Sequence, residues 1–141
     1  MRHPVFLLLL VALSGCAGVH DLGDRNCLPL QVPADVILVQ EVGLYTRGET
    51  ATKLLMEHPR DAANDASARI RLETTLEPGT SIRIQRLVQE WGYDIGQASI
   101  KAMGLTPDGD KFEYHWGFGD KIYRAPWEPE TSDVRVVACK T

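Results

Sequence analysis

Glu113 and His115 are the two side chains of this sequence whose types and spacing best fit acid–base chemistry. Residues two apart in an extended strand lie on the same side, so the carboxylate and the imidazole are expected to face each other. A paired carboxylate and imidazole can accept and return a proton near neutral pH. The same pair is also a common hydrogen-bonded surface contact without a catalytic role, and we favour that interpretation.

No established catalytic motif accompanies this pair. The chain lacks a Gly-x-Ser-x-Gly nucleophile motif and a phosphate-binding Gly-Lys loop. The four histidines are not spaced as metal ligands, and Gly117-Phe118-Gly119-Asp120 is not followed by the helix that a nucleotide loop requires. We therefore predict no catalytic set, no metal site and no cofactor, and we keep an enzyme only as an alternative.

Aromatic side chains gather in the second half of the chain. Four of them are spaced by two, so they share one face of a strand: Phe112, Tyr114, Trp116 and Phe118. This row is either an aromatic platform for a sugar or peptide or, as we favour, the buried side of a central strand. Others lie near expected strand ends or turns and are the better candidates for an exposed ligand-binding patch, because loops often carry binding residues. These candidates are Trp91, Tyr93, Tyr123 and Trp127.

Length and charge exclude some classes of protein. The chain has 141 residues, which suits a single domain and not a multidomain enzyme. It carries 15 Lys and Arg residues against 19 Asp and Glu residues, a net charge of -4. Because a protein that binds nucleic acid through the phosphates needs a basic surface, this balance argues against a nucleic-acid partner.

The start of the chain differs in composition from the rest. Arg2 is followed by an uninterrupted apolar run over residues 5–13. This run is too short for a membrane-spanning helix, which needs about 20 residues, but it suits the apolar part of a secretion signal. The next residues, Leu13-Ser14-Gly15-Cys16, resemble the lipobox of bacterial lipoproteins. The alternative is a buried N-terminal element in which Cys16 is incidental.

The lipobox resemblance implies that residues 1–15 are a signal peptide and that Cys16 is lipidated after cleavage. In that family an Asp after the lipidated Cys commonly retains the protein at the inner membrane. Ala17 stands there instead, which implies the periplasmic face of the outer membrane. Residues 16–26 are predicted as a lipid-anchored tether, and residues 27–141 as one globular domain. The predicted partners therefore include the membrane itself, through the lipid.

Cys27 and Cys139 are the two cysteines left once Cys16 is assigned to the lipid. An even number of cysteines in an oxidising compartment favours a disulfide. We therefore predict a Cys27–Cys139 bond that joins the two ends of the domain. The alternative is a pair of free thiols.

Alternation of apolar and polar residues from Ile70 onward predicts short strands joined by tight turns. The predicted turns lie at Glu77–Thr80, Gly92–Asp94 and Thr106–Asp110, where Pro, Gly and Asp favour turn geometry. Upstream of this region, the β-branched run Val36–Val42 is predicted as a first, buried strand.

Helix is expected only in a small part of the chain. Thr52–Glu57 is predicted as a helical turn, and Arg60–Ala68 as a short exposed helix or a loop. The predicted fold is therefore mainly β, a small barrel or a sandwich of six to seven short strands with at most one or two short helices. The stretch Leu76–Ile84, with a Gly-Thr turn before alternating apolar residues, resembles a strand entry of bacterial SH3-like domains, which favours the barrel.

Together these features predict a lipoprotein that is anchored at the periplasmic face of the outer membrane and acts by binding. Its partner would be an envelope protein, a peptidoglycan fragment, or a secreted enzyme or toxin that it inhibits. Two alternatives stay open. One is a small envelope enzyme that acts on glycan or peptide through Glu113 and His115, and the other is a structural subunit of an envelope assembly.

Overall fold

The computed structural model describes residues 17–57, 69–94 and 96–139, and their regular elements are all strands. In chain order these are β1 (Ala17–Asp21), β2 (Ala34–Ile37), β3 (Val42–Arg47), β4 (Lys53–Glu57), β5 (Ile70–Leu76), β6 (Ser81–Gly92), β7 (Gly96–Leu105), β8 (Lys111–Phe118), β9 (Lys121–Ile122) and β10 (Arg135–Val136). The predicted mainly β class is confirmed. The described residues form one open sheet of ten strands, more than the six or seven predicted. In the same residues no helix has the length and apolar character to cross a membrane.

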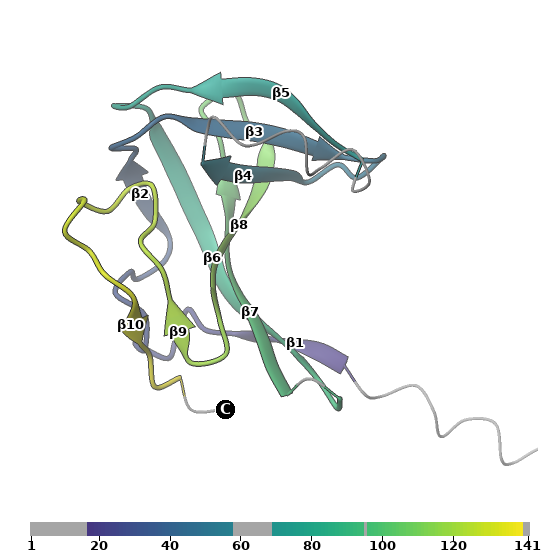
Figure 1. Cartoon of the computed structure of the whole chain (residues 1–141), viewed down its shortest axis with the longest axis vertical. Coiled ribbons are helices and arrows are strands. Elements are labelled where there is room, and N and C mark those ends of the chain that lie inside the picture. Colours follow the sequence, from purple (N-terminus) through teal and green to yellow (C-terminus); the bar gives the residue numbers. More distant parts are fainter. Residues whose placement is uncertain (1–16, 58–68, 95, 140–141) are drawn as a thin grey trace, which may run out of the picture.

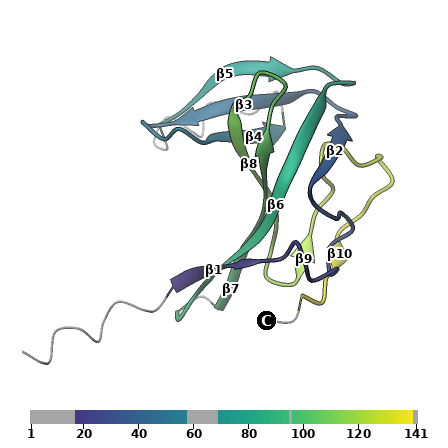
Figure 2. The ribbon, with the colours of Figure 1, turned by 180° about the vertical axis from the view of Figure 1, so that it is seen from behind.

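The sheet is organised around the long strands β6, β7 and β8, in the order β1-β6-β7-β8-β4-β3-β5. Strands β1 and β2 pair with different halves of β6, β1 with residues 88–92 and β2 with residues 81–84. Strand β8 is divided in the same way, since its first half pairs in parallel with β4 and its end pairs with β9, which β10 extends. The layer formed by β3, β4 and β5 therefore lies across one end of the long strands, and β1 and the β6–β7 turn lie at the other (Figures 1 and 2).

The predicted turns are confirmed, and they end the long strands where the sequence indicated. Gly79 and Gly109 adopt positive φ angles of 90° and 88°, which glycine reaches without steric cost. The amide of Gly109 donates to the carbonyl of Thr106 at 3.0 Å, which closes the turn between β7 and β8. Residues 93 and 94 form the turn after β6.

Two predictions for the first half of the chain are wrong. Lys53–Glu57 is strand β4 and not a helical turn, because it pairs with β3 on one side and with β8 on the other. These backbone hydrogen bonds outweigh the helix propensity of its Leu, Met and Glu residues. The predicted strand Val36–Val42 is two strands, β2 and β3, separated by residues 38–41. The predicted helix or loop Arg60–Ala68 lies outside the described residues.

The prediction of a tether over residues 16–26 is wrong for residues 17–21. Ala17–Asp21 is strand β1, which pairs antiparallel with β6 so that Ala17 lies opposite Gly92. Leu22, directly after β1, is 2% exposed and belongs to the core. The short, glycine-containing segment carries little strand propensity of its own, and the neighbouring edge of β6 supplies its hydrogen bonds. The sheet therefore begins at the residue that follows Cys16, which itself lies outside the described residues.

One hydrophobic core is enclosed by the curved sheet, and it confirms most of the aromatic row. Phe112, Tyr114 and Trp116 are buried, whereas Phe118 is 57% exposed. A β-bulge explains the difference, because the register between β7 and β8 shifts between Ile100 and Lys101. Beyond this bulge the inward and outward positions of β8 are exchanged, and Phe118 faces solvent.

Cys27 and Cys139 are joined by a disulfide, as predicted. The two cysteines are 112 residues apart in sequence, so the bond ties the segment after β1 to the segment after β10. Both also pack against the hydrophobic core. The segment between β1 and β2 is therefore held covalently to the segment after β10.

Candidate functional site

Two adjoining cavities lie where β4 runs alongside β8, and we call them together the cleft. The first cavity has a volume of about 260 Å³ and is lined by Arg47, Leu54, Leu55, Met56, Ile70 and His115. The second has a volume of about 450 Å³ and is lined by Arg47, Thr50, Ala51, Thr52, Leu54, Lys101 and Glu113. Because Arg47 and Leu54 border both cavities, one ligand can contact both.

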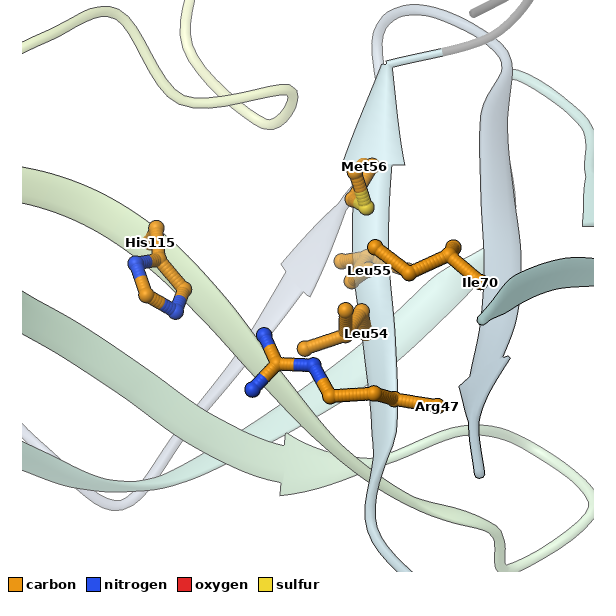
Figure 3. Close-up of a pocket in the computed structure, with 6 residues that line it drawn as sticks. All are labelled: Arg47, Leu54, Leu55, Met56, Ile70 and His115. Carbon is orange, nitrogen blue, oxygen red and sulfur yellow. The ribbon is translucent and has the colours of Figure 1, made fainter. Parts of the chain in front are cut away.

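The first cavity combines an apolar floor with basic side chains. Figure 3 shows the guanidinium group of Arg47 extending from β3 toward the imidazole of His115 on β8, with Leu54 beside it. Met56 and Ile70 continue the apolar lining along β4 and at the start of β5. Within the described part of the chain, no carboxylate lies within ion-pair distance of Arg47. The guanidinium group is therefore available to an anionic group that enters the cleft.

A row of alternating charges crosses β6, β7 and β8 and reaches the second cavity. Lys101 Nζ lies 2.6 Å from Glu90 Oε1 and 3.6 Å from Glu113 Oε2. His115 Nε2 lies 3.5 Å from Glu113 Oε1. We call Glu90, Lys101, Glu113 and His115 the charged row. Because the Lys101 and Glu113 side chains are only 13% and 18% exposed, solvent screens their interaction less than it screens a fully exposed ion pair.

The neighbours of Glu113 hold its carboxyl group in the ionised form. The polar contact with His115 is the largest cause that lowers the pKa of Glu113 below its ordinary value. Partial burial acts in the opposite direction, while the positive charges of Lys101 and Arg47 lower the pKa further. Glu113 therefore acts as a hydrogen-bond acceptor and not as a proton donor near neutral pH.

The structure brings Glu113 and His115 together, as their spacing on a strand predicts, and places both at the border of the cleft. The rings of Phe112, Tyr114 and Trp116 are not beside them, because these three lie on the opposite, buried face of β8. Tyr114, between the two, donates its hydroxyl hydrogen to the carbonyl of Arg124 at 3.2 Å. The cleft therefore offers cationic, carboxylate and aliphatic groups to a ligand, without an aromatic platform.

The aromatic residues predicted as an exposed patch do not gather in one place. Trp127 packs edge-on against Tyr114 and Trp116, with ring centroids 5.2 and 5.5 Å apart. Tyr123 follows β9, and its carbonyl accepts a hydrogen bond from the indole of Trp116 at 3.0 Å. Trp127 is thus largely a packing residue at the border of the core, and Tyr123, at 48% exposure, is the more accessible of the two.

Trp91 and Tyr93 lie at the opposite end of the long strands from the cleft. We call this region, made of residues 17–20, 91–94, 96 and 97, the hairpin end. The ring of Trp91 covers Gly18, where a Cβ atom would come within 2.7 Å of the indole nitrogen, and it stacks on His20 with centroids 5.6 Å apart. His20, Trp91, Gly96 and Gln97 line an open hollow of about 380 Å³. Tyr93 is 84% exposed, so its ring is free to contact something outside the domain.

Several cleft residues escaped the sequence analysis. Arg47 lies in a stretch to which no element was assigned, Leu54 was placed in a helical turn, and Lys101 has no distinctive spacing. Lys101 lies directly opposite His115 across the β7–β8 hairpin. The approach of Arg47 and Leu54 to His115 depends instead on the parallel pairing of residues 53–54 with residues 112–113. A contact between such distant segments leaves no local pattern in the sequence.

Comparison of the chain with protein-family models, with curated proteins and with solved structures gave no match. We therefore infer function from the sequence motifs and from the geometry of the cleft and the hairpin end. In the stretches that the structure describes, no group of three or more His, Cys, Asp or Glu side chains is placed to hold a metal ion.

Proposed function

We propose that this protein is a lipoprotein that is anchored through Cys16 at the periplasmic face of the outer membrane and binds a partner in the cleft. The motif Leu13-Ser14-Gly15-Cys16 supports the anchor, and Ala17 in place of Asp supports the outer membrane. A disulfide between Cys27 and Cys139 suits an oxidising compartment. Strands β3, β4 and β5 lie at the opposite end of the sheet from the start of β1 (Figure 1). Because these strands supply much of the cleft lining, the cleft would face away from the anchored end.

The cleft favours a small ligand that combines a carboxylate with short alkyl groups. Arg47 carries this proposal, because its planar guanidinium group can bind a carboxylate through two parallel hydrogen bonds. Leu54 and Met56 offer aliphatic contacts directly beside it. A peptidoglycan stem peptide has free carboxylates and alanine methyl groups. Among the partners predicted from the sequence, we therefore propose a peptidoglycan fragment as the ligand.

Substitutions at the lipobox test the anchor. Cys16→Ser removes the thiol that would receive the diacylglycerol, so the protein is expected to lose its acyl mass and to leave the membrane fraction. Ala17→Asp is expected to keep the lipid but to shift the protein from the outer to the inner membrane. Mass spectrometry and membrane fractionation measure both results. Unchanged mass and partitioning of the Cys16→Ser variant would refute the lipoprotein proposal.

Titration with a soluble stem-peptide fragment tests the cleft. Calorimetry with the lipidated protein in detergent is expected to show binding, and Arg47→Ala is expected to weaken it by about tenfold or more, because a charge-assisted hydrogen bond is lost. Arg71→Ala is the matched control, since Arg71 is exposed on β5 and does not line the cleft. Equal affinities of the wild type and the Arg47→Ala variant would exclude the cleft as the site, and absence of binding would favour a protein partner.

The distance of 3.5 Å between Glu113 and His115 favours a second candidate function, a small envelope hydrolase that acts on glycan or peptide. In this proposal the ionised Glu113 orients the imidazole, and His115 accepts the proton of an attacking water. Incubation with purified peptidoglycan would then release soluble fragments, and His115→Ala would abolish their release while stem-peptide binding at Arg47 persists. Release that is equal in the wild type and the His115→Ala variant would count against the enzyme.

A further inference from the structure

We infer that the hairpin end contacts the lipid headgroup layer, with the ring of Tyr93 inserted among the headgroups. This inference rests on the proposed anchoring at Cys16 and adds an orientation of the domain that anchoring alone does not require. A long tether would let the domain turn freely above the membrane. The pairing of β1 with β6 removes that freedom, because the sheet begins at Ala17.

The register between β1 and β6 places the β6–β7 turn beside the anchor. Adjacent Cα atoms are about 3.8 Å apart, so Ala17 is held close to the lipid-bearing residue. Gly92 lies directly opposite Ala17, at the spacing of about 5 Å that antiparallel partners keep, and Tyr93 follows Gly92. The polar headgroup region of a bilayer is roughly 5–8 Å deep on each side. A residue this near to the anchor therefore lies within reach of that region.

Tyr93 has the side chain and the exposure that a membrane–water interface favours. Tyrosine and tryptophan are enriched at this interface because their rings are apolar and carry a polar group at the edge. Tyr93 is 84% exposed, the largest exposure among the large apolar and aromatic side chains of the described residues, whereas Phe112, Tyr114 and Trp116 of β8 are buried. The nearby ring of Trp91 is partly exposed above Gly18, so a second amphipathic ring borders the same surface.

The charge of the hairpin end indicates apolar rather than electrostatic contact with lipid. Asp94 is exposed next to Tyr93, and an acidic side chain does not attract anionic headgroups. Val19 on β1, which is 59% exposed, adds aliphatic surface to this end. The contact is therefore expected to be insensitive to ionic strength.

Fluorescence quenching by brominated lipids tests the contact. The lipidated protein would be reconstituted into vesicles of phosphatidylethanolamine and phosphatidylglycerol whose acyl chains carry bromine near the headgroup. Tyr93→Trp adds a reporter at the hairpin end, and Tyr123→Trp is the matched control, since Tyr123 is also exposed but follows β9. The emission that Tyr93→Trp adds to the wild-type spectrum is expected to be mostly quenched at low and at high salt, and the emission added by Tyr123→Trp is expected to persist.

The outcomes separate this inference from the proposed anchor. If the lipidated protein partitions into the vesicles while the reporter at position 93 stays unquenched, the membrane contact is refuted and the anchor stands. Equal quenching at positions 93 and 123, or quenching that disappears at high salt, would also overturn the stated orientation. If mass spectrometry finds no lipid and the protein stays in solution, the anchor and the contact are both refuted.

Discussion

The cleft and the hairpin end lie on the same long strands but are built in different ways. The cleft takes its residues from β3, β4, β5, β7 and β8, which are distant in sequence and meet only in the folded sheet. The hairpin end takes its residues from β1 and from the turn that joins β6 to β7. Its aromatic surface consists of the exposed ring of Tyr93 and the ring of Trp91, which covers Gly18 and stacks on His20 of β1.

This contrast shows what each kind of surface requires. A cleft that orients a carboxylate needs cationic side chains held in place, and the ion pairs of Lys101 with Glu90 and Glu113 restrict the groups that border it. A surface that meets a fluid lipid layer needs no fixed geometry, only an amphipathic ring near the anchor. Substitutions at one end are therefore expected to leave the other end unchanged, because distant sites contribute independently.

Removal of the disulfide is expected to have the largest effect, because it lowers the stability on which both ends depend. Cys27 and Cys139 are 112 residues apart, and a loop of that length gives a loss of about 4–5 kcal/mol in the Cys27→Ser/Cys139→Ser variant. Urea denaturation measures this free energy of unfolding, with the wild type after reduction and alkylation as a second sample that lacks the bond. An unchanged urea midpoint in both samples would contradict a stabilising role for this bond.

Much of the second half of the fold was predictable from sequence, because local chemistry specifies it. The turns at Gly79 and Gly109 need glycine at positive φ, and Pro78 and Pro107 lie next to the sites where the chain reverses. The disulfide followed from the number of cysteines and the expected compartment. The turns and the disulfide could be predicted without knowing which strands pair.

The remaining features depend on tertiary pairing and were missed for that reason. The sequence of β4 has good helix formers, and only its two neighbours make it a strand. The segment of β1 has few strand-forming residues, yet it forms a strand because its backbone pairs with the edge of β6. Phe118 keeps the spacing of the buried aromatic row, but the bulge between β7 and β8 turns it outward. Arg47 lines the same cavity as His115 only because β3 pairs with β4 and β4 lies along β8.

A methyl group at Gly18 would test the hairpin end alone. The Cβ of Gly18→Ala would come within 2.7 Å of the Trp91 indole nitrogen, so the ring must move off β1 at an expected cost of about 1–3 kcal/mol. The Trp emission is expected to shift to longer wavelength as the indole becomes more exposed, while stem-peptide affinity at the cleft stays the same. Ala17→Ser is the control, because Ala17 is the exposed residue next to Gly18 on β1. Gly48→Ala is unsuitable as a control, since Gly48 has a positive φ of 55°. A changed stem-peptide affinity would show that the two ends are coupled.

Neutralising Glu113 is expected to have the smallest effect, and only at the cleft. The fold lowers the pKa of Glu113, chiefly through the contact with His115, so the ionised carboxylate stabilises the folded state above its ordinary pKa of about 4.5. This contribution is lost as the pH falls through the lowered pKa of the folded state. Glu113→Gln is therefore expected to lower the free energy of unfolding near pH 7 by less than about 1 kcal/mol, since His115 is half exposed and solvent screens the pair.

The pH dependence distinguishes this charge effect from a packing defect at the same position. The stability difference between the wild type and the Glu113→Gln variant should shrink toward zero as the pH drops below the carboxyl range, because the wild-type side chain is then neutral as well. Urea denaturation at a series of pH values measures it, and Glu130→Gln, on an exposed loop, serves as the control. A difference that persists at acid pH would mean that the amide disturbs packing. If the Glu113→Gln variant also differed from the wild type in the emission of Trp91, the charged row would couple the cleft to the hairpin end.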